Sequence, residues 1–147
     1  MRFKFHGWIA EVDVEATKRA YASGGPGASA ECGCSECANF AAAREAGYIY
    51  PAKVARLLED MGVDLTRESE VFVESPAHRG SLVYGGWFNI AGELLEGPDE
   101  AVEIEQGFEL LACPEGAVVD DAFGEVPVFR IEFLALAPVM DALRRKK

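Results

Sequence analysis

The sequence predicts one α+β domain over residues 1–147, with a mostly antiparallel sheet of about five strands and two to four helices that lie mainly in the N-terminal half. Two observations predict this class. In the first half, apolar residues recur at the spacing of a helix face, whereas from about residue 70 they alternate with polar residues, as in a strand with one buried side. The length also fits one domain, and half of the residues are hydrophobic, so the chain can bury a substantial core.

The first predicted element is one half-buried strand near the N-terminus. Its sequence, RFKFHGWIAEV, places Phe3, Phe5 and Ile9 on one alternating face. Asp13 follows directly and can accept a backbone N–H bond at a helix start, which predicts a short helix over residues 14–21.

Two further helices are predicted after a loop. The Gly/Ala/Ser-rich segment at residues 22–31 is expected to be this loop, because small residues bury little surface. The following stretch, SECANFAAAREAGY, is rich in alanine and favours a helix that Gly47 can end in a left-handed conformation. The next helix is expected from Pro51 to Gly62, since Val54 and three later apolar residues follow the i, i+3, i+4, i+7 spacing.

Four strands are predicted in the second half, which makes five with the first. They are EVFVES, SLVYGGWFNIAGEL, AVEIEQGFELLAC and PVFRIEFLALA, and turn-length gaps separate them. This pattern is typical of an antiparallel sheet with one solvated face. Gly85 and Gly86 are expected to form a bend or bulge, and a short C-terminal helix is expected after Pro138.

The charge distribution disfavours nucleic acid as a partner. The net charge is −11, and residues 80–143 carry one basic residue, Arg130, against thirteen acidic residues. Such a surface repels a phosphate backbone. The chain also lacks an apolar run of membrane-spanning length, and its start does not have the pattern of a secretory signal. We therefore expect a cytoplasmic protein without a nucleic-acid or membrane partner.

The stretch ECGCSECANF brings three of the four cysteines close together in the sequence, as Cys32, Cys34 and Cys37. Clustered thiols in a reducing compartment indicate metal or redox chemistry rather than structural disulfides. Gly33 permits an unusual turn between the first two cysteines. The alanine-rich helix is expected to begin directly after Cys34, and the N–H groups and dipole of a helix start stabilise thiolates.

These three cysteines predict a metal site, most simply for zinc. A closed tetrahedral zinc site needs a fourth ligand. Cys113 in ACPEG is the first candidate for this ligand, and His78 and His6 are the alternatives. The protein is then a small domain that binds a metal, a ligand or a protein partner, and no residue is assigned a catalytic role.

Two other interpretations of the cysteines stay open. Cys34 and Cys37 form a Cys-x-x-Cys pair at a helix start and could serve a thiol redox protein, although a glycine-rich loop precedes them in place of the usual buried strand. Alternatively, the thiols are chemically inert and the protein is an interaction module without such a site.

One aromatic residue outside the cluster is a candidate for ligand binding. Trp87 lies in GGWFN, where glycines permit the close approach of a ligand and the indole offers a stacking surface. A position in the core is the alternative, because glycine in a strand commonly marks a bulge and tryptophan is usually well buried.

The stretches CGCSECANF, YPAKVARLLEDMGVD and YGGWFNIAG together resemble a family of small uncharacterised bacterial proteins. That family shares a Cys-Gly-Cys-x-x-Cys-x-Asn-Phe stretch, a helix ending near Gly-x-Asp and a later aromatic Gly-Trp-Phe strand, over most of residues 8–133. The resemblance brings no established activity. It implies that the three cysteines and Asn39 belong to a recurring signature, in which Asn39 is expected to cap the loop by bonding the backbone near Cys32.

Overall fold

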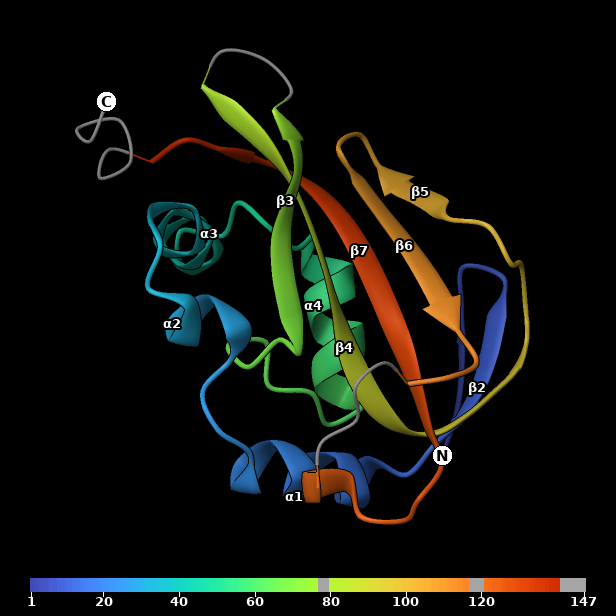
Figure 1. Ribbon diagram of the computed structural model, residues 1–147. Helices are drawn as coiled ribbons and strands as arrows, with labels where there is room; N and C mark the ends of the chain where they lie inside the picture. The colour runs from blue at the N-terminus through green and yellow to red at the C-terminus, as the bar shows by residue number, and fades with distance from the viewer. Residues whose placement is uncertain (77–79, 117–120, 141–147) are drawn as a thin grey trace.

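The computed structural model describes residues 1–76, 80–116 and 121–140 and confirms the α+β class (Figure 1). Within these residues, seven strands form an antiparallel sheet in the order β1-β2-β4-β7-β6-β5, and β3 pairs with β4 outside this path. The strands are β1 (Arg2–Phe5), β2 (Trp8–Val12), β3 (Glu70–Pro76), β4 (Ser81–Glu96), β5 (Val102–Glu105), β6 (Phe108–Cys113) and β7 (Val128–Pro138). The helices are α1 (Val14–Ser23), α2 (Ala28–Cys32), α3 (Ser35–Glu45) and α4 (Ala52–Asp60), and a short 3₁₀ turn, η1, spans Asp121–Phe123.

The sheet has more strands than the predicted five because two segments expected to be single strands are hairpins. His6 and Gly7 join β1 to β2 with φ angles of 48° and 96°, as in a tight two-residue turn. Gln106 and Gly107 join β5 to β6, and Gly107 has a φ of 84°. A two-residue turn interrupts the apolar alternation so briefly that each hairpin resembles one continuous strand in the sequence.

The first hairpin also changes which residues face the core. Phe5 pairs with Trp8 across the turn, so these two side chains lie on the same side of the sheet. Trp8 and Ala10 are fully buried, whereas Ile9 is half-buried on the opposite side. The predicted face of Phe3, Phe5 and Ile9 is therefore wrong at Ile9.

The longest pairing in the sheet joins β4 to β7 through eleven consecutive residue pairs without a shift in register. The two adjacent glycines of β4 therefore form no bulge in this ladder, and the irregularity nearby lies in β3, between Val73 and Ser75. The glycines serve close packing instead. A Cβ on Gly86 would lie 2.4 Å from the carbonyl oxygen of Glu70 and 2.7 Å from the ring of Phe133.

The opposite edge of β4 is shared by two shorter strands. β3 pairs with the first half of β4 and β2 with its last residues, and α1 bonds the stretch between them. Tyr21 donates its hydroxyl hydrogen bond to the carbonyl of Asn89 (2.9 Å), and Thr17 Oγ1 accepts from the N–H of Ala91 (3.1 Å). The carboxylate of Asp13 caps α1 by accepting a backbone N–H bond in the first turn, as predicted.

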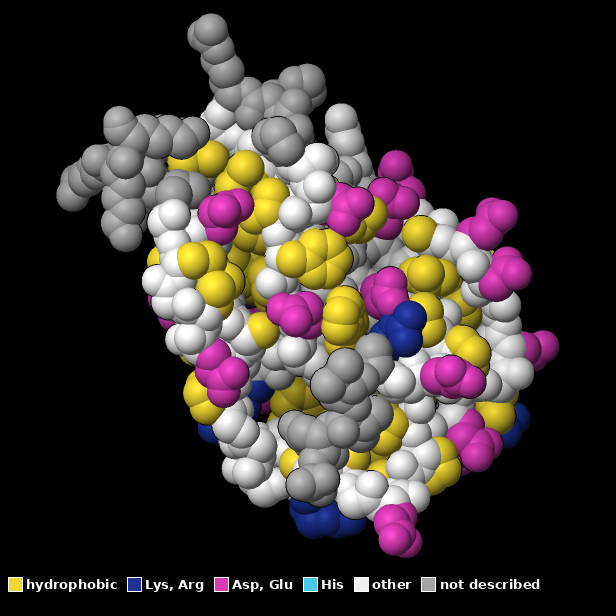
Figure 2. All heavy atoms as spheres, in the orientation of Figure 1, with side chains coloured by type: hydrophobic (Ala, Val, Ile, Leu, Met, Phe, Trp, Pro, Cys, Tyr) yellow, Lys and Arg dark blue, Asp and Glu magenta, His cyan; other side chains and the backbone are white. Residues whose placement is uncertain are grey.

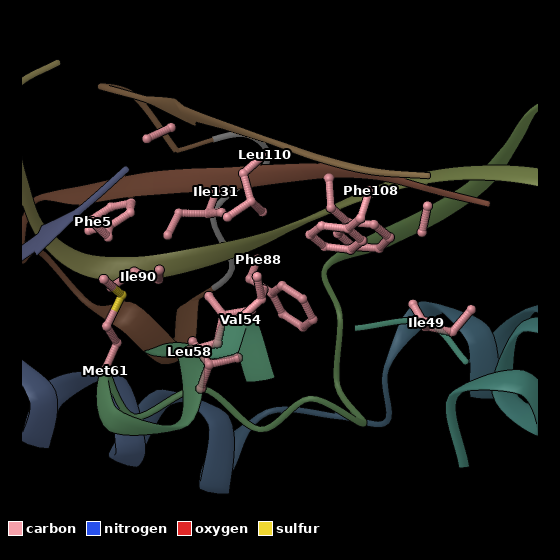
Figure 3. Close-up of a cluster of buried hydrophobic side chains, with 14 of the residues drawn as sticks. Phe5, Ile49, Val54, Leu58, Met61, Phe88, Ile90, Phe108, Leu110 and Ile131 are labelled. Carbon is pink, nitrogen blue, oxygen red and sulfur yellow. The ribbon is translucent and has the colours of Figure 1, made fainter. Parts of the chain in front are cut away.

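The core lies between the sheet and the helices behind it, α4 in particular. We call the side of the sheet that faces α4 the inner face and the opposite side the outer face. Inner-face side chains from β4, β6 and β7 point toward α4 and the residue that follows it. Figure 3 labels several members of this core: Val54, Leu58, Met61, Phe88, Ile90, Leu110 and Ile131.

The helices agree with the prediction except in the segment 22–31. As expected, α3 ends before Gly47 and α4 before Gly62, and both glycines have positive φ angles of 85° and 101°. In the segment 22–31, α1 extends into the predicted loop and α2 occupies its last residues. The helix predicted after Pro138 falls largely outside the described residues. Within the described ranges, no helix has the length and apolar character needed to cross a membrane.

Replacing Gly86 by alanine should destabilise the protein by about 1–3 kcal/mol, because the added Cβ overlaps a backbone oxygen of β3 and the Phe133 ring. Urea denaturation measures this change. Gly25→Ala is the matched control, since a Cβ there would meet only Glu31 at 3.5 Å, and its stability should change by less than about 0.5 kcal/mol. Equal stability of the two variants would contradict the close packing of β3 on β4.

Candidate metal centre

Three cysteine thiols gather where α2 meets α3. Cys32 is the last residue of α2, Cys34 is the N-cap of α3 and Cys37 lies in the first turn of α3. Gly33 has a φ of 69° and reverses the chain between the helices; a Cβ there would meet no atom within 4 Å, so glycine is needed for the torsion and not for space. The three Sγ atoms all lie within 4.8 Å of one another, which confirms the predicted cluster.

The separations suit a shared metal ion. Zinc–sulfur bonds of about 2.3 Å at tetrahedral angles place neighbouring sulfurs about 3.8 Å apart. The Sγ atoms of Cys32 and Cys34 are 3.1 Å apart, closer than in such a site and well beyond the roughly 2.0 Å of a disulfide. Both side chains are exposed, so solvent does not hinder a change in their rotamers, and all three Sγ atoms lie within 4.8 Å of one another.

The Cys34 thiol sits where a thiolate is stabilised. A hydrogen bond with the Cys32 thiol lowers the pKa of Cys34, and a backbone hydrogen bond from the N–H of Cys37 lowers it further. This N–H donates to Cys34 Sγ at 3.3 Å, so the sulfur takes the place of the oxygen in a usual N-cap. The positive end of the α3 dipole acts in the same direction.

The Cys37 thiol has the opposite character. Its side chain is buried, and burial raises the pKa of Cys37 far above its ordinary value, with Cys32 and Cys34 raising it further. A bound cation reverses this balance because it supplies the positive charge that a buried thiolate lacks. The cluster therefore combines one thiol whose pKa is lowered with one whose pKa is raised and whose ionisation a bound cation would favour.

A groove with a volume of about 440 Å³ opens beside the thiols. Its walls come from the α2–α3 junction on one side and from β3 and β4 on the other. The lining residues are Cys32, Cys34, Glu36, Cys37, Val71, Phe72, Val73 and Tyr84. Since Cys32 and Cys34 are exposed, an ion or a small molecule can reach the sulfurs from solvent.

A buried carboxylate anchors α2 next to α3. The side chain of Glu68 is fully buried; it accepts the backbone N–H bond of Ser29 (2.7 Å) and pairs with Arg44 of α3 (3.2 Å). Its own carbonyl accepts from the N–H of Ala28 (3.0 Å). Gly27 packs directly on the chain before β3, where a Cβ would lie 2.6 Å from a carbonyl oxygen. These contacts position the end of α2, and with it Cys32, relative to α3.

Asn39 holds the start of α3 against the sheet. Its side-chain amide donates to the hydroxyl of Tyr84 (3.0 Å) and to the carbonyl of Pro138 (3.1 Å), and its side-chain oxygen accepts from the N–H of Met140 (2.6 Å). Tyr84 in turn donates to the carbonyl of Glu36 in the first turn of α3 (2.8 Å). These bonds differ from the expected cap of the cysteine loop, because the buried side chain points from α3 to the sheet.

The predicted fourth ligands are not part of the thiol group in the described structure. Cys113 lies in β6, where its thiol donates to the carboxylate of Glu132 at 3.7 Å, and burial and this carboxylate raise the pKa of Cys113. His6 is exposed in the turn between β1 and β2. His78 lies outside the described residues. Among the residues that the structure describes, the closely spaced metal-ligating group consists of the three clustered cysteines.

Trp87, the candidate for ligand binding, lies on the outer face of the sheet. Its side chain is half-buried, and its ring centroid is 6.3 Å from that of Phe72 on the neighbouring strand. This half-buried position on the outer face differs from the core position that was the alternative interpretation of Trp87. Its role in ligand binding stays a prediction.

The sequence did not identify three residues that support the site, Glu68, Arg44 and Tyr84. Glu68 lies in a polar stretch between α4 and β3, and nothing local distinguishes it from exposed acids. Arg44 gave a weak signal, as a long cation in an alanine-rich helix. Tyr84 fits the alternation of its strand, but its hydroxyl partners depend on how α3 packs on the sheet.

The functional conclusion rests on this geometry. No protein-family model matches the chain, and neither a curated protein nor a solved structure matches it. Membership of the bacterial family with a Cys-Gly-Cys-x-x-Cys-x-Asn-Phe stretch therefore stays a prediction.

Replacing Asn39 by alanine should destabilise the protein by about 2–3 kcal/mol, because three polar partners in a largely buried region lose their hydrogen bonds at once. Guanidinium denaturation monitored by circular dichroism gives the change. Ala38→Ser, at the exposed neighbouring position, should change stability by less than about 0.5 kcal/mol. A similarly small effect for Asn39→Ala would mean that α3 is not tied to the sheet through this side chain.

Proposed function

We propose that this protein binds one zinc ion through the thiolates of Cys32, Cys34 and Cys37, as a small metal-binding domain. The observation that carries the proposal is the convergence of the three Sγ atoms within 4.8 Å at the start of α3. The helix start contributes partial positive charge and a backbone N–H bond to Cys34 Sγ, both of which favour the ligating thiolate form.

The donor set selects the kind of metal. Thiolates are soft ligands that prefer zinc, copper(I) or iron–sulfur chemistry, whereas calcium and magnesium take oxygen ligands. Three sulfurs from one short segment suit a single tetrahedral ion, and zinc is the usual occupant of such sites. Glu36 lines the same groove, and its negative charge further favours a cation there.

The metal would act mainly on the junction between α2 and α3. In the proposed complex it links Cys32 at the end of α2 to Cys37 inside α3, in addition to the anchoring contacts of Glu68. A water molecule or a small ligand in the groove would complete the coordination. Cys113 and His78 stay predictions for this position.

Purified without a metal-affinity tag, the protein should contain about one zinc per chain, and Cys34→Ser should weaken zinc binding by at least about 100-fold because it removes a ligating thiolate. Elemental analysis measures the content, and competition with a chromophoric chelator measures the affinity. Cobalt(II) substitution should give the intense near-ultraviolet absorption of sulfur-to-metal charge transfer.

Cys113→Ser is the matched control, because its thiol contacts Glu132 and lies outside the cluster. It should retain the zinc content and the cobalt spectrum. Equal zinc binding by Cys34→Ser and the unchanged protein would contradict the proposed ligand set. Loss of zinc in Cys113→Ser would instead make Cys113 the fourth ligand.

A second candidate function is thiol–disulfide exchange by Cys34 and Cys37. The observation that favours it is the contrast between an exposed Cys34 with a lowered pKa and a buried Cys37 with a raised pKa. Redox pairs commonly combine one readily ionised attacking thiol with one protected thiol. In such a reaction the Cys34 thiolate attacks a substrate disulfide, forms a mixed disulfide and releases one substrate thiolate. That thiolate takes the proton of Cys37, and the Cys37 thiolate then attacks Cys34 Sγ, forms the Cys34–Cys37 disulfide and releases the second substrate thiolate.

The two functions differ in what the purified protein contains. Metal binding predicts three reduced thiols in the cluster together with one zinc, whereas redox exchange predicts a metal-free protein with a reducible bond between Cys34 and Cys37. Mass spectrometry after alkylation, with and without prior reduction, separates these states. Reduced thiols without metal would contradict both and favour an interaction module with inert cysteines.

A further inference from the structure

The outer face of the sheet carries a group of partly exposed apolar side chains. The strand register places Phe72 and Leu134 in one row across β3, β4 and β7, with a glycine of β4 between them, and Trp87 and Leu111 in the next row. Phe72 is 40% exposed and Leu136, further along β7, is 43% exposed. Trp87, Leu111 and Leu134 are half-buried. α4 lies on the opposite side of the sheet (Figure 1).

Acidic side chains flank this apolar group. Glu70 and Glu132 lie in the same row as Trp87, and Glu109 and Glu103 continue the row that contains Phe72. Arg130 carries a positive charge beside this group, but its guanidinium already pairs with Glu132; Arg2 and Lys4 also face outward, on β1 at the far end of the strand order. Figure 2 shows this face, where hydrophobic side chains are interspersed with Asp and Glu and few basic groups are visible.

One acidic pair on this face is unfavourable for the isolated protein. Glu103 and Glu109 lie directly opposite each other on β5 and β6. Like charges at paired positions of an antiparallel sheet destabilise it. A positive charge placed between them would remove this repulsion. The arrangement therefore suits a cationic partner better than it suits open solvent.

We propose that the outer face binds a basic amphipathic segment of another protein, with its apolar side chains on Phe72, Trp87 and Leu134 and its Lys or Arg side chains on Glu103 and Glu109. We call Glu70, Glu103, Glu109 and Glu132 the acidic frame. Apolar contact would supply affinity, and the acidic frame would favour positively charged partners and speed their association. A second copy of this chain is a poor occupant, because each copy carries a net charge of −11 and would bring its own acidic frame to the contact.

The intrinsic fluorescence of Trp87 can be used to measure this interaction. Of its two tryptophans, Trp8 is fully buried and Trp87 is half-buried on the outer face. The probe is a short synthetic peptide in which lysines flank a Val-Phe-Val centre. Its binding should change the emission of Trp87 and protect it from quenching by acrylamide, with saturation at rising peptide concentration. The corresponding peptide with glutamate in place of lysine should bind at least about tenfold more weakly.

Variants on the full-length protein locate the contact. Glu109→Lys and Phe72→Ala should each weaken binding of the lysine peptide by at least about tenfold, because they alter the acidic frame and the apolar group respectively. Glu59→Lys, on the exposed side of α4, is the charge-matched control and should bind with less than about twofold change. Denaturation curves show whether each variant is folded, and Glu109→Gln replaces Glu109→Lys if the latter is not.

Three outcomes would overturn the proposal. The first is equal binding of the lysine and glutamate peptides, which removes the role of charge. The second is an equal loss of binding in Glu59→Lys and Glu109→Lys, which makes the attraction a property of net charge alone. The third is self-association of the protein in analytical ultracentrifugation that Phe72→Ala abolishes, which makes the occupant a second copy. Cys34→Ser should bind the peptide with the same affinity as the unchanged protein. The peptide test therefore does not depend on whether the zinc proposal is correct.

Discussion

The uninterrupted pairing of β4 with β7 is the constraint on which the rest of the structure depends. Because side chains alternate along both strands, one fixed register assigns Tyr84, Phe88, Phe129 and Phe133 to the inner face and Trp87 and Glu132 to the outer face. A slip by one residue would exchange the two faces. Along its other edge, the long β4 strand pairs with β3, accepts a hydrogen bond from α1 and pairs with β2, so elements far apart in the sequence meet along it.

The thiol group depends on this ladder although its cysteines lie outside the strands. Asn39 connects the first turns of α3 to Tyr84 in β4 and to the carbonyl of Pro138 at the end of β7. Glu68, just before β3, connects α2 to Arg44 of α3. Both contacts place hydrogen-bonded polar side chains in buried positions, where such bonds favour one specific arrangement of the elements. Cys32 and Cys34 are thus exposed at the end of helices that these contacts hold against the sheet, and Cys37 is buried beneath them.

The edge strand β3 lies between the two proposed binding surfaces. Phe72 lines the groove beside the cysteines and also belongs to the apolar group of the outer face. An edge strand normally exposes unpaired backbone groups, and here α2 and α3 lie along that side of β3. The three cysteines lie in the segment that covers this sheet edge, so the proposed metal ion would link the two helices that cover β3.

The sequence by itself determined the α+β class, the cap of α1 at Asp13, the end of α3 at Gly47 and the cysteine cluster, because these features depend on contacts within a few residues. It did not separate β1 from β2 or β5 from β6, because each turn is only two residues long and apolar residues continue on both sides of it. Only the tertiary structure decided the supports of the site and the position of Cys113 beside Glu132 on the sheet. Glu68 bonds a residue 39 positions away and Asn39 one that is 99 positions away, and such contacts follow from how the sheet and the helices pack, which no local pattern encodes.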